Sequence, residues 1–244
     1  MYTNQILPYY RASHILVGFP TRYVARLLND HGKTLEPIVL RDKLTIAYER
    51  CATDLTDGLF MASRNGQSFM RWDEAFLRPG PESAGHWVYG DNYQAYGLWE
   101  TKSDINGAPN NISMHFSEHA WLNDLHRQRR YIIRLDGFVS LHAPLAGGEL
   151  ITKPVTFTGQ QLSVNYSTSA AGGLYVELQD LAGQPLAGFS REDCLEHYGD
   201  STEQVIRWKS GTDVSTLAGK PIRIRFILKD GDLYSYRFGT TNVR

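Results

Sequence analysis

Three carboxylates lie in sequence surroundings that suit catalysis of hydrolysis. Asp91 lies between two tyrosines, Glu100 ends the same aromatic stretch, and Asp57 belongs to a Thr-Asp-Gly triplet. Cleavage of a glycosidic bond needs two carboxyl groups, about 5 Å apart for retention and about 6.5 to 9.5 Å apart for inversion. Aromatic surroundings raise the pKa of a carboxyl group, which favours Glu100 as a general acid. The alternatives are that Asp91 and Asp57 bond to turn amides and that Glu100 is a solvated strand end.

An aromatic stretch and two basic residues upstream of it are candidates for binding a sugar. Aromatic rings suit the C–H faces of sugars as well as they suit a hydrophobic core. Arg11 and His14 face opposite sides of a strand unless a bulge intervenes, and one of them is expected to point into a central pocket. With core packing or loop anchoring as the alternative, the candidate ligand-binding residues are Arg11, His14, Trp87, Tyr89, Tyr93 and Trp99.

The histidines do not show the spacing of a metal site. His115, His119 and His126 suggest one, but no pair has zinc spacing. On a strand, Glu118 and His119 are expected to face opposite sides. An EF-hand pattern for calcium is also missing from the sequence. We therefore predict neither a metal nor a cofactor.

The composition argues against several kinds of partner. A formal net charge of −1 over 244 residues gives no field that would recruit nucleic acid or an anionic membrane. No apolar run approaches the ~20 residues of a membrane-spanning helix, and residues 1–5 lack a signal sequence. We predict a soluble protein of unknown compartment, with two cysteines, Cys51 and Cys194, that are free and buried.

The first half of the chain combines short strands with long polar connectors. The Asn65-Gly66 pair predicts a hairpin, because both positions tolerate positive φ. Short strands without intervening helices are typical of propeller blades or of a sandwich. Strands are expected at 15–19, 43–48, 58–63, 68–72, 89–100, 112–118 and 131–135.

The second half begins at residues 134–141 and alternates regularly between apolar and polar residues. Each expected strand has one apolar face, and two such faces must cover each other in an antiparallel β-sandwich or jelly roll. We predict an all-β chain with two domains, propeller-like blades in 1–130 and a β-sandwich in 131–244. The expected strands are 148–157, 162–167, 174–180, 205–208, 222–228 and 233–238.

Long runs of the sequence resemble one group of proteins. Residues 136–140, 147–154, 167–172, 217–226 and 229–238 resemble the C-terminal sandwich of bacterial proteins similar to glycoside hydrolase family 32. Residues 9–20 and 56–64 resemble late blades of the five-bladed propeller in that group, which is related to fructosidases and arabinanases. The resemblance covers essentially the whole chain and implies the C-terminal half of a longer relative, of a kind expected to be exported.

The resemblance does not carry over the family's catalytic residues. The nucleophile motif of family 32, Trp-Met-Asn-Asp-Pro, is found nowhere in the sequence, and Arg11 stands where related proteins have the acid. The implied function is hydrolysis of glycosidic bonds in an oligo- or polysaccharide by paired carboxylates. One alternative is a non-catalytic carbohydrate-binding or assembly module that lacks a complete active site. Another is a homo-oligomeric scaffold that pairs through exposed strand edges.

Overall fold

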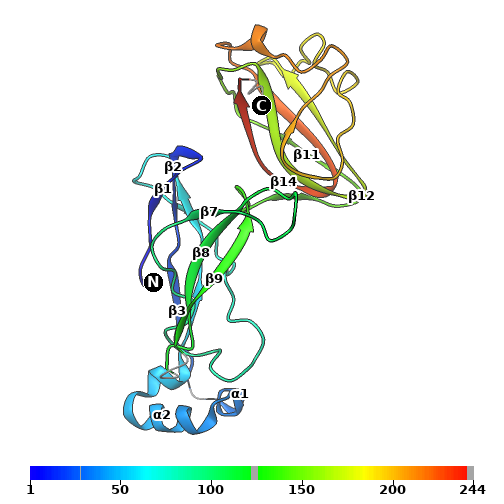
Figure 1. The fold of residues 1–244 in the computed structure, drawn as a ribbon. Helices are drawn as coiled ribbons and strands as arrows, with labels where there is room; N and C mark the ends of the chain where they lie inside the picture. The colour runs from blue at the N-terminus through cyan, green and yellow to red at the C-terminus, as the bar shows by residue number, and fades with distance from the viewer. Residues whose placement is uncertain (28, 122–125, 241–244) are drawn as a thin grey trace. The chain divides into compact units, whose positions relative to one another are not determined.

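The computed structural model describes residues 1–27, 29–121 and 126–240, and β-strands dominate it (Figure 1). The fold is all-β, as predicted, with two helices in the first half. The chain divides into two compact units. The N-terminal unit comprises Met1–Asp104 and Asn110–Ile133, and the C-terminal unit comprises Ile105–Pro109 and Arg134–Arg244.

The strands in the described residues of the N-terminal unit form three sheets. Their strand orders are β1-β2-β5-β6, β3-β4 and β7-β8-β9. A four-stranded antiparallel sheet is the form of a propeller blade, but the propeller itself stays a prediction. The strands are β1 (Leu7–Tyr9), β2 (Ala12–Gly18), β3 (Thr21–Val24), β4 (Leu55–Gly58), β5 (Met61–Ser63), β6 (Met70–Arg71), β7 (Trp99–Thr101), β8 (Asn111–Glu118) and β9 (Arg127–Arg134).

The hairpin predicted at Asn65-Gly66 is confirmed. β5 and β6 pair antiparallel on either side of it, with Met61 opposite Arg71. Gly66 has a φ of +72°, a left-handed conformation that glycine adopts at little cost. The turn residues of this hairpin were therefore sufficient to predict it.

The strand predicted at 43–48 is wrong, because this stretch lies inside a helix. Helix α1 spans Asp30–Thr34 and helix α2 spans Ile38–Thr53, with a kink at Tyr48. The helix contains neither glycine nor proline, and the six-residue alternation that suggested a strand is too short to distinguish the two structures. Most of the helix is exposed, and the residues that it buries are Arg41, Cys51 and Ala52.

The strand predicted at 89–100 is also largely wrong. Only β7, at its end, is extended in a sheet, and the residues before it form an irregular connector from β6. Trp87, Asn92 and two glycines, Gly90 and Gly97, have positive φ values between 60° and 117°, which interrupt a strand. This connector carries four of the nine candidate site residues, Trp87, Tyr89, Asp91 and Tyr93.

The C-terminal unit contains one five-stranded sheet, ordered β10-β14-β12-β13 with β11 also paired to β14 (Figure 1). Its strands are β10 (Leu141–Ala143), β11 (Gly148–Ile151), β12 (Gln161–Gln179), β13 (Asp200–Val205) and β14 (Arg223–Gly239). Strands β12 and β14 each join two predicted strands. They pass closely where the register shifts, since a Cβ on Gly172 or Gly231 would meet a backbone oxygen at 2.5 Å or less.

The alternating apolar residues of β12 and β14 meet in one core. Leu162, Val164, Leu174 and Ile224 have no exposed surface. The long sheet therefore curls around its own interior, whereas a sandwich of two separate sheets stays a prediction. Cys194 belongs to this core, and both cysteines of the chain are free and buried, as predicted.

Glu177 on β12 is expected to make the stability of the C-terminal unit depend on pH. Burial raises its pKa, but hydrogen bonds from Gln179, the Arg191 backbone and Arg225 outweigh burial and lower the pKa below 4.5. A carboxylate with a lowered pKa stabilises the fold above its unfolded-state pKa and loses that contribution as the pH falls through its folded-state pKa.

We therefore expect Glu177→Gln to lower the free energy of unfolding by about 1–3 kcal/mol at pH 7, with a smaller difference below pH ~4. Urea unfolding at both pH values measures it, and Glu149→Gln, which changes an exposed partner of Arg225, is the control. A difference that does not change with pH would show that the charge of Glu177 contributes nothing.

Candidate functional site

Four tyrosine rings from separate parts of the N-terminal unit lie together. Tyr23 is on β3, and Tyr2 is placed beside it because its backbone bridges Thr21. Tyr89 and Tyr93 come from the connector before β7. The Tyr2 ring centre lies 5.7 Å from that of Tyr23, 6.1 Å from that of Tyr89 and 6.0 Å from that of Tyr93. We call these four residues the tyrosine cluster, and two of them are predicted ligand-binding residues.

The surroundings of Tyr23, Tyr89 and Tyr93 in the tyrosine cluster favour the neutral form of their phenols. Tyr23 donates a hydrogen bond to Asp54, which raises the pKa of Tyr23 to about 12. A hydrogen bond within the cluster raises the pKa of Tyr89, and burial raises that of Tyr93. The guanidinium carbon of Arg50 lies 5.4 Å from the Tyr89 ring centre, in reach of a cation–π contact. All four tyrosines are partly exposed residues, and Arg50 is exposed.

Asp91, the first predicted catalytic residue, is buried between the two connector tyrosines. Thr56 on β4 fixes its backbone, because the Thr56 hydroxyl donates to the Asp91 carbonyl at 2.7 Å and accepts from the Gly90 N–H at 3.0 Å. The Asp91 carboxylate accepts from the Ala120 N–H at 2.8 Å. Burial raises the pKa of Asp91 to about 6, although backbone hydrogen bonds act in the opposite direction.

A buried arginine ties the connector to helix α2. Arg41 is 5% exposed and donates to the carbonyls of Leu35 at 2.7 Å, Ala52 at 2.9 Å, His86 at 3.2 Å and Trp87 at 2.8 Å. Burial lowers the pKa of Arg41. Because a guanidinium has five N–H donors in a fixed fork, this one side chain can position several backbone segments at once.

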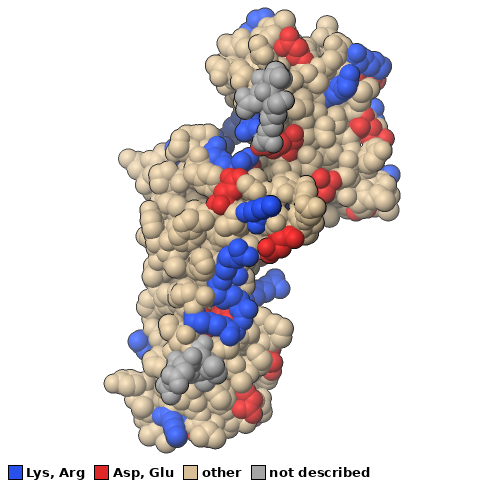
Figure 2. All heavy atoms as spheres, viewed as in Figure 1, with Lys and Arg blue, Asp and Glu red and all other residues tan. Residues whose placement is uncertain are grey.

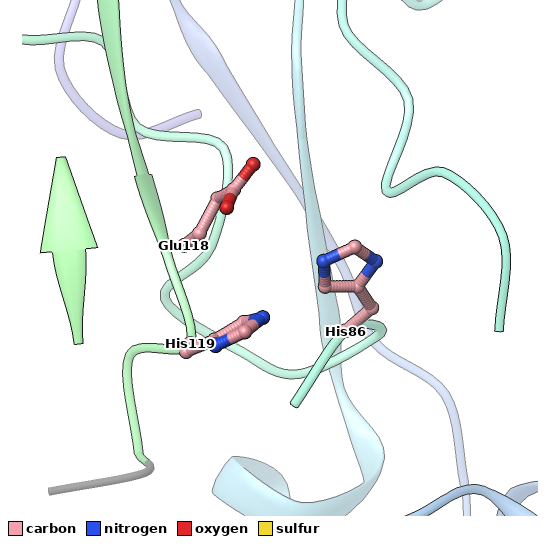
Figure 3. A group of neighbouring side chains, drawn as sticks. All are labelled: His86, Glu118 and His119. Atoms are coloured by element: carbon pink, nitrogen blue, oxygen red, sulfur yellow. The ribbon is translucent and has the colours of Figure 1, made fainter. Parts of the chain in front are cut away.

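The side chains of His86, Glu118 and His119 lie close together (Figure 3). Glu118 is the last residue of β8, His119 follows it, and His86 comes from the connector. One ring nitrogen of His86, one ring nitrogen of His119 and one carboxylate oxygen of Glu118 all lie within 4.8 Å of each other. The His86 Nδ1 atom lies 3.2 Å from the Pro81 carbonyl, which can only accept a hydrogen bond. His86 therefore carries its proton on Nδ1 when neutral, which leaves a lone pair on Nε2. We call these three residues the histidine–glutamate cluster.

Glu118 is held as an anion in this cluster. Its carboxylate accepts hydrogen bonds from Arg127 Nε at 3.0 Å, Arg129 Nε at 2.7 Å and Tyr131 Oη at 2.6 Å. Burial opposes ionisation, but these three donors lower the pKa of Glu118 to about 2. The carboxylate is therefore ionised throughout the ordinary pH range.

The expectation that Glu118 and His119 face opposite sides is wrong. β8 ends at Glu118, and His119 has a φ of +59°, so strand alternation does not extend to it. The change of backbone direction at His119 places its side chain close to that of Glu118. Burial lowers the pKa of His119, and among the described residues its buried Nδ1 atom has no hydrogen-bond partner.

The other two predicted catalytic carboxylates lie away from the tyrosine cluster. Glu100 is exposed on β7 and accepts hydrogen bonds from Asn110 and Tyr10, each at 2.8 Å, which lower its pKa instead of raising it. Asp57 on β4 accepts two hydrogen bonds from Arg22, one of them at 2.9 Å. These contacts suit a fixed anion in both cases.

The remaining predicted ligand-binding residues are spread over the N-terminal unit. Arg11 lies in the turn before β2, close enough to lower the pKa of Glu100, and His14 is exposed on β2. Trp87 donates to the Gly80 carbonyl at 2.9 Å. Trp99 is 46% exposed, and its ring centre lies 5.4 Å from that of His115. Only Tyr89 and Tyr93 of the predicted six belong to the tyrosine cluster.

Sequence reasoning missed several residues of both clusters. Tyr2, Tyr23 and Arg50 reach the tyrosine cluster from segments that are distant in the chain, and no local pattern marks them. His86 is 32 positions before Glu118, far outside any zinc-ligand spacing. His86 precedes Trp87, whose positive φ depends on the folded structure and is not marked by the local sequence.

No helix in the described ranges is long and apolar enough to cross a membrane. No protein-family model matches the chain, and the search of curated proteins gave no significant match. Among solved structures, the chain is similar to one described as a glycoside hydrolase family 43 arabinoxylan arabinofuranohydrolase from Bacillus subtilis in complex with cellotetraose. The TM-score is 0.27 and the sequence identity 10%, over 93% of this chain and 38% of that chain. The chain thus spans well under half the length of that protein, and likeness at this level carries no functional argument. The resemblance to family 32 stays a prediction.

Proposed function

We propose that the N-terminal unit binds an oligo- or polysaccharide at the tyrosine cluster. The observation that carries the proposal is the meeting of the rings of four partly exposed tyrosines beside an exposed cation, Arg50. A sugar presents C–H faces that pack on aromatic rings and hydroxyls that exchange hydrogen bonds with phenols and charged groups. The resemblance of the sequence to carbohydrate-active proteins supports this choice of ligand.

Binding is placed at the tyrosine cluster because its residues are more exposed to solvent than the buried carboxylates of the same unit. Asp91 and Glu118 are 3% and 5% exposed, so neither carboxylate is presented to a polymer in this conformation. The four tyrosines of the cluster, in contrast, are partly exposed residues. We therefore expect the tyrosine cluster to bind a sugar without rearranging. Most ligand sites are largely formed before the ligand arrives.

Hydrolysis of a glycosidic bond is the second candidate function. Asp91 supports it, because it lies between Tyr89 and Tyr93 in the chain and would be next to a sugar held by their rings. Its carboxylate would come into contact with the sugar after a movement of the connector. Sugar release from arabinans, fructans and aryl glycosides, compared with that by Asp91→Asn, tests this candidate; release that Asp91→Asn leaves unchanged would exclude Asp91 as a catalytic residue.

Titration calorimetry with arabino-oligosaccharides, fructo-oligosaccharides and xylo-oligosaccharides tests the binding proposal. We expect at least one of these to bind with a dissociation constant between about 1 μM and 1 mM, a range usual for a small polar ligand. Binding should persist in Asp91→Asn, which removes the candidate catalytic carboxyl group and leaves the rings in place. Heats of dilution alone across the whole panel would contradict the proposal.

A further inference from the structure

We propose that the histidine–glutamate cluster, His86, Glu118 and His119, binds a divalent transition-metal ion of the zinc type. Two imidazole nitrogens and one carboxylate oxygen are a ligand set that zinc takes in proteins. Three protein ligands leave one position of a tetrahedron for water. This proposal concerns a site separate from the tyrosine cluster, and it does not depend on sugar binding.

The positions of the ligand atoms suit a metal ion better than they suit hydrogen bonds between the side chains. The three atoms lie within 4.8 Å of one another, and the His119 Nδ1 atom makes no hydrogen bond within the described residues. Ligands at 2.0–2.2 Å from a shared ion are separated from one another by more than a hydrogen-bond length, at roughly 3.2–3.6 Å in a tetrahedron. A bound of 4.8 Å on the separations of the three atoms is compatible with these distances.

His119 gives an independent indication that a ligand is bound here. Its side chain is 9% exposed, and among the described residues its Nδ1 atom has no hydrogen-bond partner. A buried polar atom without a partner costs about 1–3 kcal/mol, which a metal–nitrogen bond would offset. Figure 3 shows the ring turned towards His86.

His86 is oriented as metal-binding histidines usually are. Its Nδ1 atom faces the Pro81 carbonyl at 3.2 Å, and a backbone carbonyl behind one ring nitrogen fixes the tautomer that presents the other nitrogen to a metal. Glu118 contributes an ionised carboxylate that Tyr131 and two arginines hold in place. The cluster therefore has both ligands and the contacts that position them.

The positive charges of nearby arginine side chains repel a metal ion but do not exclude its binding. Basic side chains gather over the part of the N-terminal unit where β9 lies (Figure 2), and two of them, Arg127 and Arg129, contact Glu118. Their side chains are 45% and 48% exposed, so water screens their charge. The negative charge of Glu118 offsets part of their positive charge.

Zinc titration of the full chain after removal of metals with a chelator tests the proposal. We expect one zinc ion per chain, an increase in thermal stability on addition of zinc, and a cobalt complex with visible absorption bands. His86→Gln and His119→Asn should each weaken binding at least about 10-fold. Asparagine is chosen at 119 because it tolerates the positive φ. His31→Gln, which changes an exposed histidine 3.0 Å from Glu82 in the same unit, is the matched control and should bind zinc as the unaltered chain does.

The outcomes separate a built site from adventitious binding. Loss of affinity in either cluster variant, if that variant keeps the circular dichroism spectrum of the unaltered chain, supports the proposal. Absence of stoichiometric zinc binding in the unaltered chain would overturn it. Equal affinity in the unaltered chain, His86→Gln and His119→Asn would overturn it as well, because the zinc would then be bound elsewhere.

Discussion

Replacing Tyr89 and Tyr93 together by alanine is expected to weaken glycan binding by at least about 30-fold, equivalent to about 2 kcal/mol. Both rings would pack on the sugar, and each ring contributes through buried area as well as through its hydroxyl. The fold should persist, because the backbone of this connector is held by Thr56, Ser117 and Arg41, which the variant keeps. The sugar would lose its contact surface while the connector remains.

Calorimetric titration with the tightest-binding oligosaccharide of the panel measures this effect. Tyr48→Ala is the matched control, since Tyr48 is 71% exposed on α2 and makes no part of the tyrosine cluster. Replacement of Tyr89 and Tyr93 by phenylalanine separates the two contributions, because it removes only the hydroxyls and should cost less affinity than alanine. Equal affinities of the double alanine variant and of the Tyr48→Ala control would contradict the assignment of the site.

Replacing Arg41 by methionine is expected to lower the free energy of unfolding of the N-terminal unit by about 3–5 kcal/mol. Methionine fills a similar length of space but donates no hydrogen bond. The buried carbonyls of Leu35, Ala52, His86 and Trp87 would lose a charged donor together. Because His86 and Trp87 belong to the connector, the variant should weaken sugar binding and zinc binding as well.

Urea unfolding followed by tryptophan fluorescence measures this loss of stability. Four of the five tryptophans, Trp72, Trp87, Trp99 and Trp121, belong to the N-terminal unit, so the signal reports mainly on that unit. Lys43→Met makes a similar change at an exposed position of the same helix and should alter stability by less than about 0.5 kcal/mol. If Arg41→Met were as stable as Lys43→Met, the buried guanidinium would not be holding the connector.

The strands that were predicted well are those whose residues alternate between apolar and polar types in the sequence. Strand β8 was expected at 112–118 and lies at Asn111–Glu118, and the apolar residues of β12 and β14 face the core of the C-terminal unit. Period-two alternation of apolar and polar residues predicts such strands directly. The same argument gave no warning that β12 would continue through Gly172, because glycine there marks a close crossing of two strands and not a break.

The elements that were predicted poorly depend on contacts between distant parts of the chain. Helix α2 contains a short alternating stretch, and its buried anchor, Arg41, is a residue type that sequence patterns assign to the surface. The connector owes its path to left-handed residues such as Asn92, which nothing in the local sequence requires. His119 could be placed beside Glu118 only once its positive φ was known.

The candidate site was predicted only in part for the same reason. Tyr89 and Tyr93 drew attention because they flank Asp91 in the sequence, whereas Tyr2 and Tyr23 meet them through the pairing of the N-terminus with β3. Glu100 was favoured for its aromatic neighbours. Its pKa is lowered because Asn110 and Tyr10, from other segments, donate to it. Charge and exposure depend on the folded surroundings, which the order of residues does not show.

Hydroxyl-radical footprinting with and without a bound oligosaccharide tests the location of the sugar site most directly. The proposed site predicts that the sugar protects Tyr2, Tyr23, Tyr89 and Tyr93 from oxidation. Tyr48 and Tyr198, each 71% exposed, should be oxidised to the same extent with and without the sugar. A bound oligosaccharide that protected Tyr198 or Trp99 and left the four cluster tyrosines unchanged would contradict the account and place the sugar elsewhere on the chain.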